Sequence, residues 1–257
     1  MNKDPVSENS ADQSSSLRKE LSDEKFIAWS KSTLRDDFDV TELSDYIDSI
    51  DASSVQGLDI GGGIGAFAST VAERCNNKNL KITVVDPGVD ASEQRIEHPG
   101  VDFVLAPFDS FNSDTKYDFI VFRLVLHHLI GEDSATTLRT QREALVKAKS
   151  MLSESGVVFV IENFYEPWIG QDFTGQLIYS LTSSKAVEGI TRRLGANTAG
   201  EGVRFRSAES WKTLYDNLDL KIVSEQTNPR WGIDMPIWQK LPLLCKERYQ
   251  AIQMLKV

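Results

Sequence analysis

Short apolar runs alternate with segments of helical spacing from residue 55 to residue 161, and this alternation restricts the possible folds more than any other feature of the chain. Runs rich in Val and Ile that are separated by helices are typical of parallel strands buried on both faces. The predicted strands of this part are 55–60, 80–85, 101–106, 117–122 and 157–161. The pattern predicts an α/β fold, a mostly parallel sheet with helices on both faces.

The chain has a different character on either side of this alternation. Residues 1–16 are polar and rich in Ser, Asp and Asn, which predicts a disordered tail. Residues 17–54 show apolar groups at helical spacing and predict an N-terminal helical cover. Residues 163–206 contain helical pieces and glycine-marked breaks but no clear strand, and they predict an inserted lid.

The sequence again predicts a regular helix and strands near the C-terminus. A helix is predicted over 207–218 with Ser207 as its N-cap, followed by strands at 221–226 and 249–255. We find no internal repeat and no low-complexity segment beyond the tail. The prediction is therefore a single domain over 17–257.

Composition excludes several classes of function. The 257 residues carry a formal net charge of −10. Because neutralising phosphates requires clustered Lys and Arg, we expect no nucleic-acid partner. The two cysteines, Cys75 and Cys245, provide neither a disulfide framework nor a paired-cysteine zinc signature, and no other cluster requires a metal. We find no signal peptide and no long apolar run, so we expect a cytoplasmic protein without a membrane partner.

A glycine-rich loop follows the first predicted strand. Glycines stand at 61, 62, 63 and 65, and a helical pattern begins at Ile64. Such a loop lets the backbone approach a ligand closely, and the helix after it offers free N–H groups. The same residues also fit the dinucleotide pattern G-x-G-x-x-A through Gly61, Gly63 and Ala66, so the loop alone leaves the cofactor open.

Two carboxylates favour one cofactor. Asp59 stands two residues before the first glycine, where its charge would repel a pyrophosphate and attract an ammonium group. Asp86 ends the second predicted strand, where a carboxylate can accept both hydroxyls of a ribose, a feature that fits either cofactor. Together they suit a nucleoside with a cationic tail and no phosphate, which is the character of S-adenosylmethionine.

The sequence resembles the class I S-adenosylmethionine-dependent methyltransferases, and among them the small-molecule enzymes of the ubiquinone-biosynthesis type. The resemblance covers roughly residues 55–165. It rests on Asp59-x-Gly61-x-Gly63-x-Gly65, Val84-Val85-Asp86, Phe108-Asp109-Ser110-Phe111, and Tyr117–Phe122 followed by Leu126-His127-His128-Leu129. It implies a Rossmann-like seven-stranded sheet with an antiparallel last strand, and S-adenosylmethionine as the cofactor.

The resemblance also implies a set of cofactor-binding residues. Asp109 would pair with the exocyclic amine of the adenine. Arg123 departs from the family, in which a small or polar residue is commoner; it is expected either to pair with the acidic helices or to hold a carboxylate. The full set is Asp59, Gly61, Gly62, Gly63, Gly65, Asp86, Pro87, Phe108, Asp109, Ser110 and Arg123.

Methyl transfer from a sulfonium needs alignment and exclusion of water, and some acceptors also need a base. His127 and His128 stand just after the fourth predicted strand, at the edge where such sites open, and are our candidate catalytic residues. The alternative is that the pair caps the next helix and shapes the cofactor pocket.

The acceptor pocket is predicted to come from the insertions, because both can reach the cofactor edge. Aromatic and arginine side chains there would suit a planar or anionic small molecule. The alternative is that the aromatics form a satellite core and the arginines pair with acidic helices. The candidate residues are Trp168, Tyr179, Arg204, Arg206 and Trp231.

We expect the N-terminal helices to fold over the cofactor, with Phe26, Trp29 and Arg35 contributing. The predicted function is methyl transfer from S-adenosylmethionine to an oxygen or nitrogen of a small-molecule acceptor, by a monomer or homodimer. The alternatives are an NAD-dependent oxidoreductase and a non-catalytic S-adenosylmethionine-binding protein. The acceptor and the methylated atom stay open.

Overall fold

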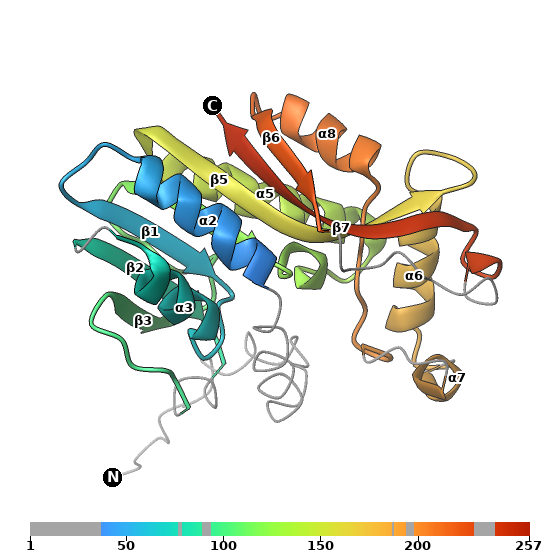
Figure 1. Cartoon of the computed structure of the whole chain (residues 1–257). Helices are drawn as coiled ribbons and strands as arrows, with labels where there is room; N and C mark the ends of the chain where they lie inside the picture. Colours follow the sequence, from blue (N-terminus) through green and yellow to red (C-terminus); the bar gives the residue numbers. More distant parts are fainter. Residues whose placement is uncertain (1–36, 77–78, 89–93, 187, 194–197, 229–239) are drawn as a thin grey trace, which may run out of the picture.

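The computed structural model describes residues 37–76, 79–88, 94–186, 188–193, 198–228 and 240–257 (Figure 1). The predicted tail and the first part of the predicted cover lie outside these residues. The same holds for four residues that the sequence singled out, which are Phe26, Trp29, Arg35 and Trp231.

The described residues form a seven-stranded sheet in the order β3-β2-β1-β4-β5-β7-β6. Strand β7 is antiparallel to both of its neighbours, and the pairs from β3 to β5 are all parallel. This confirms the predicted fold class, including the antiparallel last strand. The strands are β1 (Val55–Ile60), β2 (Leu80–Asp86), β3 (Val101–Leu105), β4 (Tyr117–Arg123), β5 (Leu152–Pro167), β6 (Lys221–Thr227) and β7 (Cys245–Lys256).

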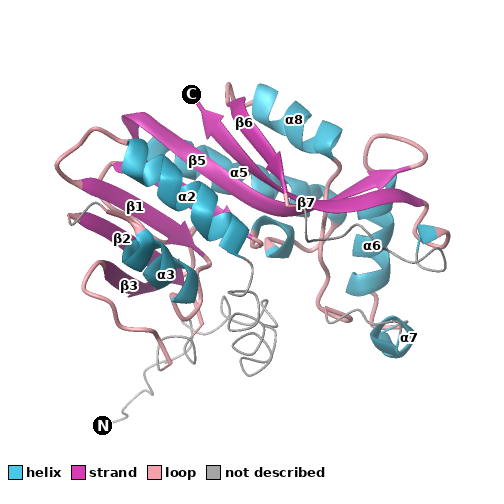
Figure 2. Ribbon diagram, in the orientation of Figure 1, coloured by secondary structure: helices cyan, strands magenta, loops and turns pink. Residues whose placement is uncertain are grey.

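Helices cover both faces of the sheet because successive side chains of a strand point to opposite sides (Figure 2). On β4, Phe119 and Val121 pack with helices α2 and α3, whereas Ile120 and Phe122 pack with α5 and α8. All four side chains are fully buried, as expected for a central parallel strand. The helices are α2 (Asp37–Ser49), α3 (Ala66–Arg74), α5 (Ser134–Met151), α6 (Phe173–Ser183), α7 (Glu188–Arg193) and α8 (Ala208–Asp216), with a 3₁₀ turn at η1 (Leu126–His128).

Two helices begin at side-chain caps. The Asp133 carboxylate accepts a 2.6 Å hydrogen bond from the Thr136 N–H at the start of α5. The Ser207 hydroxyl accepts a 3.1 Å bond from the Ser210 N–H at the start of α8, which confirms the predicted N-cap. Both caps satisfy an N–H group that has no partner within its own helix.

Strand β5 is much longer than the predicted 157–161. Its residues 163–167 pair with residues 245–250 of β7, and Figure 1 shows these two strands running on together past the rest of the sheet. We call residues 163–167 and 245–250 the β5–β7 arm. The prediction of no strand in 163–206 fails here because the pairing depends on a partner about 85 residues away, such as Tyr249, whose ring stacks on Phe164. No helix in the described ranges is long and apolar enough to cross a membrane.

Candidate functional site

The glycine loop connects β1 to α3 through backbone conformations that other residues adopt only under strain. Gly61, Gly63 and Gly65 have φ angles of 71°, 56° and 74°. A Cβ at Gly61 would overlap the side chain of Val125, and a Cβ at Gly62 would overlap the carboxylate of Asp59. The loop therefore requires glycine for its turns and for its close approach to neighbouring segments.

Asp59 sits at the carboxyl end of β1 with only 2% of its surface exposed. Neither carboxylate oxygen has a hydrogen-bond partner in the part of the chain that the structure describes. Burial raises the pKa of Asp59 to about 7; Arg123 lowers this pKa and Asp86 raises it further. A buried carboxylate without a partner is costly, and a cationic ligand group at this point would supply what it lacks.

Asp86 is the last residue of β2, and its carboxylate holds the glycine loop against the end of this strand. Its Oδ2 accepts a 2.9 Å hydrogen bond from the Gly63 N–H, and its Oδ1 accepts a 2.8 Å bond from the Gly88 N–H. Burial raises the pKa of Asp86, and these two bonds oppose the rise. Each carboxylate oxygen keeps a second lone pair, which two ribose hydroxyls could use. Pro87 lies between the two bonded segments.

The segment after β3 places its predicted cofactor residues differently. The Phe108 ring is buried, 5.9 Å from the Phe122 ring and beneath the Lys147 ammonium. Asp109 and Ser110 are exposed, and the Ser110 hydroxyl bonds to the Asp109 carboxylate at 3.4 Å. They follow the carboxyl end of β3, at the same edge of the sheet as the glycine loop, and Phe108 belongs to the core below them.

Arg123, at the end of β4, bonds to helix α2. Its Nε donates a 2.9 Å hydrogen bond to Asp39, and its guanidinium lies 5.0 Å from the ring centre of Phe67. Of the two roles that the sequence allowed, the structure shows the pair with an acidic helix. The next residue, Leu124, has a φ of 54°, which redirects the chain into η1 at a conformation that is costly for a residue other than glycine.

The first histidine of the pair is held by a buried glutamate. His127 Nδ1 lies 2.6 Å from Oε2 of Glu162, and the His127 backbone N–H donates to Oε1 of the same carboxylate at 3.3 Å. The His127 carbonyl accepts from the Arg204 N–H at 2.9 Å. No described residue bonds to Nε2. A proton on Nδ1, bonded to the carboxylate, leaves a lone pair on Nε2, the arrangement of a general base.

The second histidine is less enclosed. The His128 ring centre lies 4.2 Å from that of His127. Surrounding protein and the neighbouring His127 lower the pKa of His128 well below the ordinary value, yet its side chain keeps contact with solvent. His128 is thus surrounded by protein atoms but still exposed to solvent. It has no carboxylate partner among the described residues to orient it.

Glu162 is a residue that our reading of the sequence missed. It is 1% exposed, at the end of the apolar run Val157–Ile161 on β5. An acidic residue that directly follows a fully buried strand is the signal that could have found it, because such a charge needs a partner. The partner comes from η1, 35 residues earlier, and no local pattern connects the two.

Of the predicted acceptor residues that the structure describes, Arg204 interacts through its charge with Tyr179 and Arg206, but each arginine also has a protein partner. Arg204 pairs with Asp172 at 2.7 Å, and Arg206 donates to the Gln141 side chain at 2.8 Å. Both arginines are buried, so they hold the framework together. The Tyr179 hydroxyl donates to a backbone carbonyl at 3.3 Å, and Trp168 is 46% exposed.

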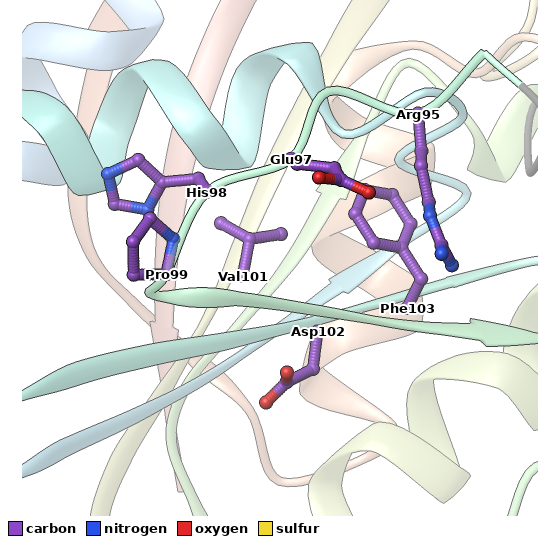
Figure 3. Close-up of a pocket in the computed structure, with 7 residues that line it drawn as sticks. All are labelled: Arg95, Glu97, His98, Pro99, Val101, Asp102 and Phe103. Atoms are coloured by element: carbon purple, nitrogen blue, oxygen red, sulfur yellow. The ribbon is translucent and has the colours of Figure 1, made fainter.

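One pocket lies away from these residues. It has a volume of about 720 Å³ and opens at the edge strand β3, between residues 95 and 103 (Figure 3). His98 lines it but is already engaged, because its Nδ1 accepts a 3.0 Å bond from the Gly100 N–H. None of the predicted site residues lines this pocket, so we do not assign the function to it.

Comparison with known proteins agrees with this geometry. A family profile described as a methyltransferase domain matches residues 33–225. A search of curated proteins found no match. A SAM-dependent methyltransferase from Leishmania major is similar with a TM-score of 0.54 and 16% identity, over 86% of this chain and 72% of that one.

Two further solved structures share the fold. Coclaurine N-methyltransferase, bound to N-methylheliamine and SAH, has a TM-score of 0.53 and 17% identity over 84% of this chain and 71% of that one. LepI in complex with SAM has a TM-score of 0.53 and 14% identity over 81% of this chain. The match spans only 44% of LepI's own length. The profile covers most of the sequence, and the chain therefore belongs to the methyltransferase-domain family, with the seven-stranded fold of the class I S-adenosylmethionine-dependent methyltransferases.

Proposed function

We propose that the protein transfers a methyl group from S-adenosylmethionine to an oxygen or nitrogen of a small-molecule acceptor and releases S-adenosylhomocysteine. The observation that supports this most is the buried carboxylate of Asp59, which has no partner among the described residues and borders a glycine loop. A cofactor with a cationic group and no phosphate fits such a site. When bound, it supplies a methyl group activated by the positive charge on sulfur.

Each part of the loop region has a distinct role in this proposal. The glycine loop lets the cofactor lie against bare backbone. Asp59 attracts the ammonium and sulfonium charges, and Asp86 accepts the ribose hydroxyls while it holds Gly63 in place. Asp109, exposed at the same edge, is available to the adenine amine. These residues bind and orient the cofactor, which is most of what an in-line displacement requires.

His127 is the group proposed to remove a proton from the acceptor. Its Nε2 has no partner among the described residues, and Glu162 fixes the ring from the other side. A positioned base of this kind raises the rate by roughly 10²–10⁴-fold when the acceptor must lose a proton. Glu162 is a positioning residue, because it acts on the acceptor only through the histidine.

The comparisons support a small molecule as the acceptor. Coclaurine N-methyltransferase is described in complex with N-methylheliamine, a small molecule, and it shares the fold over most of this chain. The NAD alternative rests only on Gly61, Gly63 and Ala66, and a diphosphate beside the ionised Asp59 would meet repulsion.

Calorimetric titration with S-adenosylhomocysteine and with NAD tests the cofactor. We expect S-adenosylhomocysteine to bind and Asp86→Ala to weaken that binding by ~1–3 kcal/mol through lost hydrogen bonds. Tighter binding of NAD than of S-adenosylhomocysteine would overturn the proposal.

Turnover is tested with methyl-labelled S-adenosylmethionine and a small-molecule extract of the source cells. A labelled low-mass product that depends on His127 supports the enzyme over a binding protein without catalysis. Normal cofactor binding with no labelled product of any kind would favour the binding protein.

A further inference from the structure

The face of the β5–β7 arm on the α2 side brings together four polar or aromatic side chains. Side chains on a strand alternate, and Val157, Phe159 and Ile161 of β5 pack in the core cluster on the α2 side. Asn163 and Tyr165 continue this series. Their register partners on β7 are Gln250 and Arg248, so the four residues are neighbours on one face.

Aromatic rings link this face to the candidate base. The Phe205 ring lies 4.6 Å from the Tyr165 ring and 4.5 Å from the His127 ring, measured between ring centres. Phe205 stands beside β5 because its neighbour Arg206 forms a bridge with Phe164. The three rings stack on one another, so the side of the stack is a wall of ring edges. Phe205 and Tyr165 are half-buried, so they still reach solvent.

A short segment connects the wall to the cofactor loop. Val125 lies against Gly61, where a Cβ would overlap it, and His127 stacks on Phe205 two residues later. The order β1-β4-β5-β7 places the end of β4 between the glycine loop and the arm. A molecule on the ring wall would thus lie next to the segment that borders the cofactor.

Two buried polar atoms on this face lack a hydrogen-bond partner among the described residues. They are Asn163 Oδ1 and Arg248 Nε. Arg248 also forms no salt bridge with any carboxylate there, in contrast to Arg204, which pairs with Asp172. Arg248 lowers the pKa of the Tyr165 phenol through its charge and through a side-chain hydrogen bond, against a larger rise caused by burial.

We infer that the acceptor binds on the β5–β7 arm, against the ring edges of His127, Phe205 and Tyr165, and that it is a planar conjugated molecule whose acidic group pairs with Arg248. Guanidinium groups bind carboxylates in a planar, two-bonded arrangement, and aromatic side chains favour flat ligands. The Asn163 carboxamide would take a hydrogen-bond donor of the same molecule. This inference rests on the proposed function and assigns to it a substrate class and a site.

The test uses 4-hydroxybenzoate as the probe, with the full-length protein saturated with S-adenosylhomocysteine. Ligand-observed NMR titration gives the dissociation constant for the wild type, Arg248→Gln and Arg139→Gln. Arg139 is an exposed residue of α5, so its variant makes the same change of charge outside the arm. We expect Arg248→Gln to weaken probe binding at least ~10-fold and Arg139→Gln to change it less than ~2-fold.

A second probe separates the charge from the ring wall. 4-Hydroxybenzyl alcohol lacks the carboxylate, so Arg248→Gln should leave its binding unchanged, whereas Phe205→Leu should weaken both probes. Equal effects of Arg248→Gln and Arg139→Gln, or the absence of 4-hydroxybenzoate binding to the wild type, would overturn the inference.

S-adenosylhomocysteine titrations of the same variants keep the two proposals apart. Unchanged affinity shows that each variant is folded and that its cofactor site is intact. If S-adenosylhomocysteine binds but the probe does not, only the acceptor inference fails. If S-adenosylhomocysteine does not bind the wild type, the proposed function fails first.

Discussion

In the part of the chain that the structure describes, a buried carboxylate lacks a hydrogen-bond partner in the glycine-loop region, whereas buried charges are paired near the N-terminal ends of α6 and α8. At the loop, Asp59 is buried and has no hydrogen-bond partner in the described residues. Near α6 and α8, Arg204 pairs with Asp172, and Arg206 bonds to Gln141 and Ser210. A folded chain normally gives its buried charges partners, because an unpaired charge is costly. The contrast identifies the second region as framework and supports the proposal of a ligand at the first.

The largest expected effect comes from closing the loop. Gly61→Ala would place a Cβ against Val125 and force alanine to a φ of 71°. We expect a loss of S-adenosylhomocysteine affinity of ~100-fold, because the loop must move to relieve the overlap. Calorimetry measures the loss. The control is Gly189→Ala, since a Cβ at Gly189 meets nothing within 4 Å; equal affinity of the two variants would contradict the role of the loop.

The next effect tests the framework region. Gln141 is fully buried; its amide donates to the carbonyls of Leu126 and Arg204 and accepts from Arg206. Gln141→Leu leaves these groups without a partner, so we expect the free energy of unfolding to fall by ~3 kcal/mol. Urea denaturation measures it, with the exposed Arg142→Leu of the same helix as the control. A large loss of cofactor affinity without loss of stability would show that this region is not framework.

The third prediction concerns how much the buried carboxylate of Asp59, unpaired among the described residues, destabilises the fold. Burial raises the pKa of Asp59 to about 7, so between pH ~4 and ~7 the native state binds a proton that the unfolded state has lost. Stability should therefore fall as pH rises through this window and level off above it. Asp59→Asn should remove this part of the pH dependence and make the cofactor-free protein ~2 kcal/mol more stable at pH 8.

The same variant should bind S-adenosylhomocysteine more weakly, because the ammonium group loses its counter-charge. Thermal unfolding between pH 4 and 8 measures the first effect and calorimetry the second, with the exposed Asp102→Asn as the control. A less stable Asp59→Asn protein at pH 8 would show that the charge is not a cost to the fold.

The smallest effect on stability is expected at Glu162. The informative measurement there is which ring nitrogen of His127 carries the proton. Glu162→Gln keeps an oxygen for His127 Nδ1, so the free energy of unfolding should change by only ~1 kcal/mol. The ring should lose its single tautomer, because a neutral amide can either accept from or donate to Nδ1. Long-range ¹H–¹⁵N NMR spectra of the histidines measure the tautomer, with Glu154→Gln on the same strand as the control. An unchanged spectrum would remove Glu162 from the positioning role.

The proposed cofactor site could be located from the sequence because its residues follow one another along the chain. Asp59 and the glycines lie within seven residues, and the end of β2 contributes Asp86. Strand boundaries in this half are also close, and β1 was predicted at Val55–Ile60, where the structure has it. Residues that lie close together in the sequence form a motif that can be recognised without the structure.

The inferred acceptor site could not be predicted in this way. Glu162 meets His127 across 35 residues, and Tyr165 meets Arg248 through strand pairing with β7. An arginine that pairs with Asp172 and an arginine without a carboxylate partner look the same in a sequence. Arg204 and Arg206 were therefore chosen as acceptor residues, whereas the structure uses them in the interior.

The bond between Arg123 and Asp39 links helix α2 to the carboxylate of Asp59, because Arg123 interacts with both aspartates. Arg123 is fixed to α2 at one atom and also lowers the pKa of Asp59. A shift of α2 that broke this bond would alter how readily Asp59 ionises, and hence how strongly it attracts a cation. By reciprocity, a cation that arrives at Asp59 must change how tightly α2 is held. Under the proposed function, cofactor binding at Asp59 and the docking of α2 are therefore thermodynamically coupled.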